Sequence, residues 1–405
     1  MFSKSLIEKF QTIETPFYYY DLDILKRTIA ALKAESEKHN FHIHYALKAN
    51  TNQQILKIIC DAGFGADCVS GNEVKAALKN NFNPSSIVFA GVGKTDKEII
   101  ESLTADIFCF NCESMEEIKV INELAASLHK KARIALRINP NVNANTHHYI
   151  TTGLEENKFG INFWELEAVM EVIKNSPSIQ LIGLHFHIGS QICDLEPFRL
   201  LCTRINEIQQ WFSSRNITII HLNVGGGLGV DYHEPDKNAI PDFKSYFNVF
   251  HKFLEIKKQQ QVHFELGRSI VAQCGALISK VLFVKKGKKT DFIILDAGMT
   301  ELIRPALYQS YHKIENLTAA FRSQQDYSKQ MEHSEHQVGD PVLNIAETKY
   351  DVVGPICESS DCFAKALLLP TTVRGHLFAL RTTGAYGQVM SLEYNLREKA
   401  KTVYS

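Results

Sequence analysis

Short apolar runs alternate with segments whose apolar residues recur every three or four positions, from about residue 20 to residue 266. A run of four to eight apolar residues is typical of a buried strand, and the longer spacing is typical of an amphipathic helix. The expected strands are His42–Leu47, Ala66–Val69, Ile87–Ala90, Ile107–Phe110, Arg133–Ile138, Leu181–Ile188, Ile219–Val224 and Val262–Leu266. The expected helices are Asp21–Lys38, Gln53–Ala62, Glu73–Lys79, Asp96–Leu103, Ser114–Leu128, Phe163–Lys174, Pro197–Ser213 and Phe243–Gln259. Eight such units predict an α/β fold built on a TIM-like (β/α)₈ barrel, with a doubly wound open sheet as the rival.

The pattern changes after Arg268. Short β-like runs then follow one another, separated by glycine, proline and charged residues, and no helical spacing of comparable length lies between them. These runs are Ser269–Val284, Phe292–Asp296, Tyr350–Gly354 and His376–Thr382, and the aromatic strand Phe17–Tyr20 is a candidate to join them. We therefore expect a barrel domain over residues 22–268 and a mostly β domain made of residues 1–21 and 269–405. The polar stretch from His312 to Val338 is expected to be an exposed excursion between strands.

Composition narrows the class of protein. The chain has 405 residues, 45% hydrophobic and 22% charged, which is ordinary for a globular protein with a large core. A net charge of −1 gives no basic field for nucleic acid or a membrane surface. No apolar run approaches membrane-spanning length, and the first residues lack the apolar core of a secretory signal. The nine cysteines are an odd number without framework spacing, so we expect reduced thiols in the cytoplasm.

Lys48 comes directly after the first expected barrel strand. Burying an unpaired ammonium costs several kcal/mol or forces the amine to become neutral. A neutral, desolvated lysine is a nucleophile toward aldehydes. The ordinary alternative is a surface lysine at a strand end. The residues at the ends of the other expected strands, described next, argue against this alternative.

Chemistry in a (β/α)₈ barrel gathers at the carboxyl ends of the strands. The sixth expected strand ends in His187–Ser190, the seventh in Gly225–Gly229, and the eighth in Glu265–Arg268. A triple glycine lets backbone N–H groups approach a phosphate, and barrels often bind phosphate after strands seven and eight; the alternative is a tight, flexible loop. Glu265 could hold a proton on a heterocyclic nitrogen, or it could pair with Arg268 or Lys48.

Histidine pairs on two strands suggest a rival site. His42-x-His44 and His185-x-His187 place histidines at alternate positions, as in metal-binding amidohydrolase barrels. An ammonium from Lys48 close by would disfavour a metal ion, and no cluster of carboxylates stands out at the other strand ends. We therefore expect no metal. The single Cys109-x-x-Cys112 pair is weak evidence for a redox or zinc site.

Seven motifs in order give the chain a family resemblance. They are Tyr45–Asn50, Gly183–Gln191, Gly225–Gly227, Glu265–Arg268, Arg304–Tyr308, Gly354–Asp361 and Gly384–Gly387. Together they resemble the pyridoxal-phosphate enzymes of the alanine-racemase-like fold, and more narrowly the diaminopimelate decarboxylases. The likeness runs from about Thr15 to Asn395. Leu266 stands where the family usually has proline and Gln309 where it usually has glycine, and the sequence stops at Ser405, which puts a final β-strand in question.

The resemblance implies a role for each candidate residue. Lys48 would hold pyridoxal 5'-phosphate covalently, and His187 would stack on its ring. The other residues expected around the cofactor are Ser190, Gly225, Gly226, Gly227, Gly267, Arg268 and Tyr386. Glu265 would pair with the ring nitrogen and keep it protonated, which favours decarboxylation over racemisation. Cys357 resembles the family's proton donor.

The implied reaction is decarboxylation of meso-2,6-diaminopimelate to L-lysine and CO₂, the last step of lysine biosynthesis. Substrate selection would fall to Arg268, Arg304, Tyr308, Glu358 and Tyr386, since arginines match a distal carboxylate and an acid matches a distal ammonium. Decarboxylases of ornithine, arginine or carboxynorspermidine are the alternatives within the fold, and a non-enzymatic pyridoxal-phosphate carrier is the alternative outside it. The resemblance also implies a homodimer in which each site takes Cys357 and Glu358 from the partner.

Overall fold

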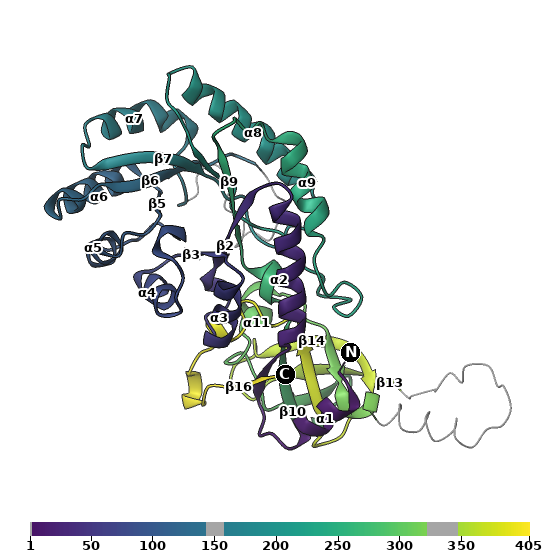
Figure 1. The fold of residues 1–405 in the computed structure, drawn as a ribbon. Coiled ribbons are helices and arrows are strands. Elements are labelled where there is room, and N and C mark those ends of the chain that lie inside the picture. The colour runs from purple at the N-terminus through teal and green to yellow at the C-terminus, as the bar shows by residue number, and fades with distance from the viewer. Residues whose placement is uncertain (1, 143–157, 322–346) are drawn as a thin grey trace. The chain divides into compact units, whose positions relative to one another are not determined.

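The computed structural model describes residues 2–142, 158–321 and 347–405, which form two compact units (Figure 1). The barrel unit contains Leu25–Val230 and Ile240–Ile270. The β unit contains Met1–Ile24, Asp231–Ala239 and Val271–Ser405. The short segment Asp231–Ala239 therefore groups with the β unit, although its sequence lies between two barrel strands.

Eight parallel strands close the barrel within the described part of the chain. They are β2 (Phe41–Ala46), β3 (Gly65–Cys68), β4 (Ile87–Phe89), β5 (Cys109–Cys112), β6 (Ala132–Arg137), β7 (Ile179–His185), β8 (His221–Asn223) and β9 (Gln261–Leu266). Each strand pairs with the next, and β9 returns to β2 with His44 opposite Glu265. All carboxyl ends therefore lie at the same face of the barrel.

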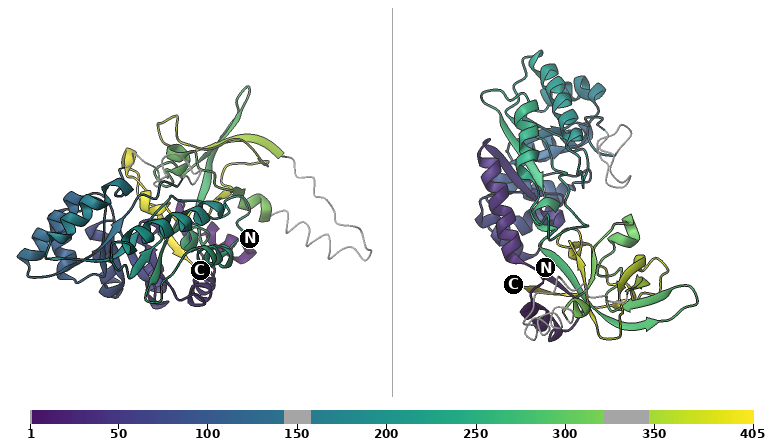
Figure 2. Two further views of the ribbon diagram at one scale, coloured as in Figure 1. Left: turned by 90° about the horizontal axis from the view of Figure 1, so that it is seen from above. Right: turned by 90° about the vertical axis from the view of Figure 1, so that its right-hand side faces the viewer.

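Helices lie outside these strands, as two further views also show (Figure 2). They are α2 (Leu22–Glu37), α3 (Gln53–Asp61), α4 (Gly71–Lys79), α5 (Asp96–Thr104), α6 (Met115–Ser127), α7 (Leu166–Lys174), α8 (Glu196–Ser213), α9 (Phe243–Phe253) and the short α10 (Arg268–Val271). The 3₁₀ turns η1 (Leu47–Ala49), η2 (Pro84–Ser86) and η4 (Phe163–Glu165) complete the connections. In α3 the side chain of Asn52 caps the first turn, and Ile55, Leu56 and Ile59 form its buried face.

The β unit is built around one sheet. Its strands are β1 (Phe17–Tyr20), β10 (Gly275–Lys285), β11 (Asp291–Leu295), β12 (Ile314–Asn316), β13 (Glu347–Val353), β14 (Cys362–Pro370), β15 (Leu377–Arg381) and β16 (Lys401–Tyr404). The order along the sheet is β12-β15-β10-β11-β13-β14. β1 pairs antiparallel with β10 and parallel with β16. The helices α1 (Lys4–Gln11) and α11 (Arg304–Tyr308) and the turns η5 (Gln388–Met390) and η6 (Tyr394–Leu396) accompany it.

The predicted fold class is confirmed: a (β/α)₈ barrel and a mostly β second part are both present. All eight expected barrel strands form, although β5 begins two residues later than predicted. The prediction for α9 was too long, because Leu254 takes an extended conformation and ends the helix. The strands β12, β14 and β16 and the helices α1, α10 and α11 were not predicted, and α10 takes the first residues of the expected β-like run Ser269–Val284. Most of the expected exposed excursion from His312 to Val338 lies outside the described residues. Its described first part contradicts the expectation, because it contains β12 and because His312, Ile314 and Asn316 are buried.

Candidate active site

Lys48 lies in η1, just after β2 ends at Ala46. Its ammonium donates a hydrogen bond to Oδ2 of Asp67 on β3, over 3.3 Å, and the Asp67 side chain is fully buried. Burial, followed by the nearby charge of Glu265, raises the pKa of Asp67 to about 6, although the charge of Lys48 acts in the opposite direction. The sequence analysis did not identify Asp67 as a site residue. The only indication in the sequence was a carboxylate on the second expected strand.

Glu265 lies at the centre of a buried polar network near the end of β9. Its Oε1 accepts hydrogen bonds from Asn111 Nδ2 (3.1 Å) and Asn223 Nδ2 (2.7 Å). Its Oε2 accepts one from His185 Nε2 (2.9 Å). Burial alone would raise the pKa of Glu265, but the field and hydrogen bond of His185, followed by the charge of Lys48, hold it below its ordinary value. The expected alternative of a direct ion pair with Arg268 or Lys48 is not the arrangement found.

The carboxylate of Glu265 has one acceptor position left. Each carboxylate oxygen can accept about two hydrogen bonds. From the residues that the structure describes, Oε1 already accepts two and Oε2 accepts one. A single further donor, such as the N–H of a protonated heterocycle, would therefore complete this group.

The glycine loop after β8 is confined by close backbone packing. A side chain on Gly226 would place its Cβ 1.8 Å from the carbonyl oxygen of Glu265. Gly225 and Gly227 have φ values of +72° and +107°, which L side chains rarely adopt. The N–H of Gly225 donates to Asn223 Oδ1 and that of Gly226 to His187 Nδ1, so two of the three amides that we expected to face a phosphate are already engaged. Among the described residues, the N–H of Gly227 has no such partner.

The ends of β7 and β9 carry the remaining barrel candidates. Arg268 is buried at the start of α10, and its Nε and one terminal nitrogen lie 3.3 and 3.1 Å from Ser190 Oγ. Burial, followed by the positive charges of Lys48 and Arg137, lowers the pKa of His187 well below its ordinary value. Gly267 directly precedes Arg268, and a Cβ added to it would lie 3.1 Å from Ala46 Cβ. A neutral imidazole and a guanidinium–hydroxyl pair thus flank the glycine loop.

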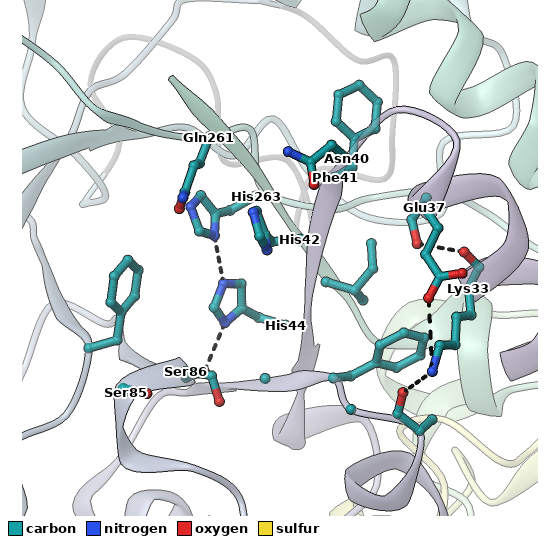
Figure 3. Close-up of a pocket in the computed structure, with 17 residues that line it drawn as sticks. Lys33, Glu37, Asn40, Phe41, His42, His44, Ser85, Ser86, Gln261 and His263 are labelled. Atoms are coloured by element: carbon teal, nitrogen blue, oxygen red, sulfur yellow. Dashed lines mark hydrogen bonds and ion pairs between the residues drawn. The ribbon is translucent and has the colours of Figure 1, made fainter. Parts of the chain in front are cut away.

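A pocket of about 490 Å³ opens at the amino ends of the strands, opposite the residues described above (Figure 3). His44 and His263 lie on its wall, and His44 Nδ1 donates to the Ser86 carbonyl over 3.0 Å. Because a carbonyl only accepts, His44 Nε2 must accept from His263 Nδ1 (2.9 Å), and His263 Nε2 must then accept from His221 Nδ1 (3.0 Å). His42 stacks on His263. In the described part of the chain, no group of three or more potential ligands has a geometry that would hold a metal ion.

Both cysteines of the Cys109-x-x-Cys112 pair lie on β5 and are buried as free thiols. Burial raises the pKa of each thiol, so neither is set up as a thiolate nucleophile or ligand.

Arg304 begins α11 in the β unit and is buried. One terminal nitrogen donates both to Tyr232 Oη and to His312 Nε2, each over 3.0 Å. His312 Nδ1 donates in turn to the carbonyl of Arg381 (2.8 Å), which fixes the neutral tautomer that can accept from Arg304. Tyr232 and His312 therefore hold the guanidinium in place, and neither was predicted from sequence.

Cys357 and Glu358 lie at the exposed tip of the loop after β13. The buried carboxylate of Asp361 organises this loop, because it accepts from the N–H groups of Ile356 (2.7 Å) and Met299 (2.6 Å). Glu358 accepts a hydrogen bond from Tyr394 Oη over 2.9 Å. The loop thus presents a thiol and a carboxylate next to each other on a fixed base.

Tyr308 and Tyr386 are both partly buried in the β unit. Gln309, which follows Tyr308, ends α11 in the left-handed region with φ +53° and ψ +31°. The glycine that the family resemblance leads us to expect here would take this conformation without strain, whereas a side chain costs roughly 1 kcal/mol. Tyr386 also has a positive φ, of +56°.

The barrel thus offers a lysine near a buried carboxylate, a second carboxylate with one acceptor position open, and a glycine loop beside an arginine. An aldehyde, a ring nitrogen and a phosphate would fit these three features, and the class of enzymes that needs a place for each of them is the pyridoxal-dependent one. Residues 22–272 match the family described as "Pyridoxal-dependent decarboxylase, pyridoxal binding domain". The chain belongs to this family of pyridoxal-dependent decarboxylases, and the expected family and enzyme class are confirmed.

Two relatives and one more distant structure place the chain further. It is 52% identical to the diaminopimelate decarboxylase of Bacteroides thetaiotaomicron over 98% of this chain and 96% of the relative. The crystal structure of diaminopimelate decarboxylase from Helicobacter pylori complexed with L-lysine superposes with a TM-score of 0.86 at 38% identity, covering 98% of this chain and 93% of that one. The arginine decarboxylase of Paramecium bursaria Chlorella virus, with 21% identity, a TM-score of 0.83 and full coverage of both chains, shares the fold.

None of the described helices combines the length and apolar character that crossing a membrane would require.

Proposed function

We propose that this chain decarboxylates meso-2,6-diaminopimelate to L-lysine and CO₂ with pyridoxal 5'-phosphate as its cofactor, which is the last step of lysine biosynthesis. The observation that carries the proposal is the 52% identity, over nearly the full length of both chains, to a diaminopimelate decarboxylase. The L-lysine in the related H. pylori structure is the product expected here. The polar network around Glu265 supports the same reaction type.

The barrel unit would hold the cofactor. Lys48 would bind its aldehyde carbon, and His187 would stack on its ring. The phosphate would lie among Ser190, Gly225, Gly226, Gly227, Gly267, Arg268 and Tyr386. The cofactor supplies a ring that accepts the electron pair left on carbon when CO₂ departs.

Glu265 would favour decarboxylation over racemisation. Its carboxylate is buried, hydrogen-bonded by three side chains, and kept ionised by the groups around it. An ionised acid favours protonation of a ring nitrogen next to it, and a protonated ring withdraws electrons more strongly.

Cys357 would return the proton to carbon once CO₂ has left. A cysteine thiol can act as a general acid. The exposed position of Cys357 suits a donor that must meet a bound substrate. Glu358 beside it would accept the distal ammonium of the substrate.

The distal amino-acid head would select the substrate. Arg304 is held by Tyr232 and His312 and would match the distal carboxylate, together with Arg268, Tyr308 and Tyr386. A substrate without a distal carboxylate, such as ornithine, would bring no negative charge to the Arg304 guanidinium and would bind less well for that reason.

We take the proposed domain division and the proposed assembly from the family resemblance. Residues 22–268 would form the pyridoxal-phosphate-binding domain, and residues 1–21 with 269–405 the β domain. Two chains would form a homodimer in which Cys357 and Glu358 complete the partner's site. An odd number of scattered cysteines favours the cytoplasm as the location.

The test is a substrate panel on the purified protein with added pyridoxal phosphate. Release of CO₂ and formation of L-lysine from meso-diaminopimelate are expected, with much slower turnover of L-ornithine, L-arginine and carboxynorspermidine. Turnover of ornithine equal to that of diaminopimelate would move the chain to polyamine synthesis. Binding of the cofactor without turnover of any substrate would favour a carrier.

A further inference from the structure

We infer that His185 is a positioning residue that keeps Glu265 ionised and correctly turned for the decarboxylation. This inference rests on the proposed function, because it concerns the carboxylate expected to face the cofactor ring. His185 lies at the end of β7 and is almost fully buried, as is the Glu265 side chain.

The hydrogen bond between the two residues has a defined direction. An ionised carboxylate only accepts hydrogen bonds, so the 2.9 Å contact requires a proton on His185 Nε2. Asn111 and Asn223 both donate to Oε1, whereas His185 is the protein donor to Oε2. Removal of the imidazole would thus leave Oε2 buried with no donor among the described residues.

A second observation separates His185 from an ordinary core histidine. Its Nδ1 is buried and has no hydrogen-bond partner among the described residues. A buried polar atom without a partner costs roughly 1–3 kcal/mol. His44, another buried histidine of the barrel, uses both ring nitrogens in hydrogen bonds instead. The chain therefore tolerates an unfavourable arrangement at His185, and what it gains is the donor to Glu265.

Loss of this donor has a definite chemical consequence. Burial favours the neutral acid, and the hydrogen bond with the field of His185 is the main opposing influence on the pKa of Glu265. A protonated Glu265 could no longer stabilise a protonated ring nitrogen. The carboxylate would then be held through Oε1 alone, because no other described residue donates to Oε2.

His185→Leu and His185→Gln separate the donor from the bulk of the side chain. Leucine fills the space without donating, whereas glutamine can still donate to a carboxylate. Infrared spectra of the apo proteins provide a readout that needs no cofactor. His185→Leu should show the carbonyl stretch of a protonated carboxylic acid at neutral pH, and this band should vanish in the double variant with Glu265→Gln. Asp67 and Glu73, whose pKa values are raised to about 6 and about 7, contribute acid bands of their own, so in the parent protein and in His185→Gln the Glu265→Gln change should remove no band.

Kinetics of the loaded enzymes give the second readout. His185→Leu should lower kcat by roughly ten- to a hundredfold, the loss expected for one charge-assisted hydrogen bond, and should move the acid limb of its pH profile to higher pH. His185→Gln should recover most of the loss. His44→Gln, which also removes a buried imidazole but no donor to Glu265, should keep the parent's acid limb.

Absence of the acid band in His185→Leu, with an unshifted acid limb, would overturn the inference and leave His185 a packing residue. Should the leucine variant fail to fold, His185→Met offers the same test, since methionine adapts to irregular space without donating. The apo spectra also distinguish a failure of the inference about His185 from a failure of the proposed function. If Lys48 does not bind the cofactor, the proposed function fails while the spectra still report on Glu265.

Discussion

The ammonium of Lys48 lies 3.3 Å from Oδ2 of Asp67, a fully buried carboxylate on the neighbouring strand. The pKa of Asp67, raised to about 6, is still below neutral, so its charge stabilises the ammonium form of Lys48 at pH 7. Only the neutral amine attacks an aldehyde. Asp67→Asn should therefore lower the pH at which the apo protein binds pyridoxal phosphate covalently. Trapping with borohydride across a pH series measures this midpoint, and Asp61→Asn, an exposed acid of α3, should leave it where it is.

Lys48 itself should be the point of attachment. Lys48→Ala should lower turnover by orders of magnitude and should abolish borohydride-stable incorporation of the cofactor, because the nucleophile is gone. Peptide mapping by mass spectrometry should find the reduced cofactor on the Lys48 peptide of the parent protein. Lys57→Ala, an exposed lysine of α3, is the matched control and should behave as the parent does. A label on another lysine would refute the assignment.

The glycine loop should tolerate no side chain at its centre. Gly226→Ala places a methyl group against the backbone carbonyl of Glu265, so we expect a loss of about 1–3 kcal/mol in the free energy of unfolding and weaker cofactor binding. Gly93→Ala is the control, because a Cβ at Gly93 meets nothing within 4 Å and should change stability by less than about 0.5 kcal/mol. Urea denaturation and cofactor titration measure the two effects. Equal behaviour of both variants would show that the loop can relax.

The histidines at the amino ends of the strands should make the barrel sensitive to acid. Burial lowers the pKa of His44 to about 4, although the charge of Glu265 opposes it, and burial also lowers the pKa values of His221 and His263. The folded state therefore binds fewer protons than the unfolded state. Its stability is complete above about pH 6.5 and is lost as the pH falls toward 4.

For His44 alone this loss is on the order of 3 kcal/mol. Denaturant unfolding at pH 7.5 and pH 5 should show a large decrease for the parent and a smaller one for His44→Gln, whose side chain does not titrate. His251→Gln, an exposed histidine of α9, should retain the parent's decrease. An equal loss in all three proteins would assign the acid sensitivity to other groups.

Mixing two inactive variants tests the proposed shared site. Lys48→Ala and Cys357→Ala should each be nearly inactive. If Cys357 acts in the partner's site, a mixed dimer collects both changes in one site and leaves the other intact. Equal mixing and complete subunit exchange should then restore about a quarter of the parent's activity, since half of the dimers are mixed and each has one working site. Verified exchange without recovery would show that each site is built within one chain.

The barrel could be predicted from the sequence because its signal is local. The spacing of apolar residues over a short stretch of sequence predicts each strand and its helix. The lysine, glycine and glutamate motifs lie at the strand ends that this spacing defines. The network around Glu265 could not be predicted in the same way. Its donors Asn111, His185 and Asn223 come from three separate strands, and only closure of the barrel brings them to one carboxylate. Likewise, Asp67 comes close to Lys48 because β2 pairs with β3, and no local sequence pattern predicts that pairing.

The β unit was harder to predict for a related reason. β14 has an alanine, Ala366, at φ +50° and irregular register with β13, so its alternation of apolar and polar residues is broken. β12 and β16 are short and depend on strands far away in the chain for their pairing. Edge strands of this kind carry little periodicity of their own.

The pairing of β1 with β10 and β16 also fixes an order of events during biosynthesis. β1 leaves the ribosome near the beginning of translation, yet both of its neighbours in the sheet are encoded far downstream. The barrel strands are synthesised after β1 and before β10, and they pair with one another. The barrel can therefore form before the strands that pair with Phe17–Tyr20 have been made. A nascent chain arrested once residue 270 has emerged from the ribosome should therefore protect the barrel from protease and leave its first twenty residues open to cleavage.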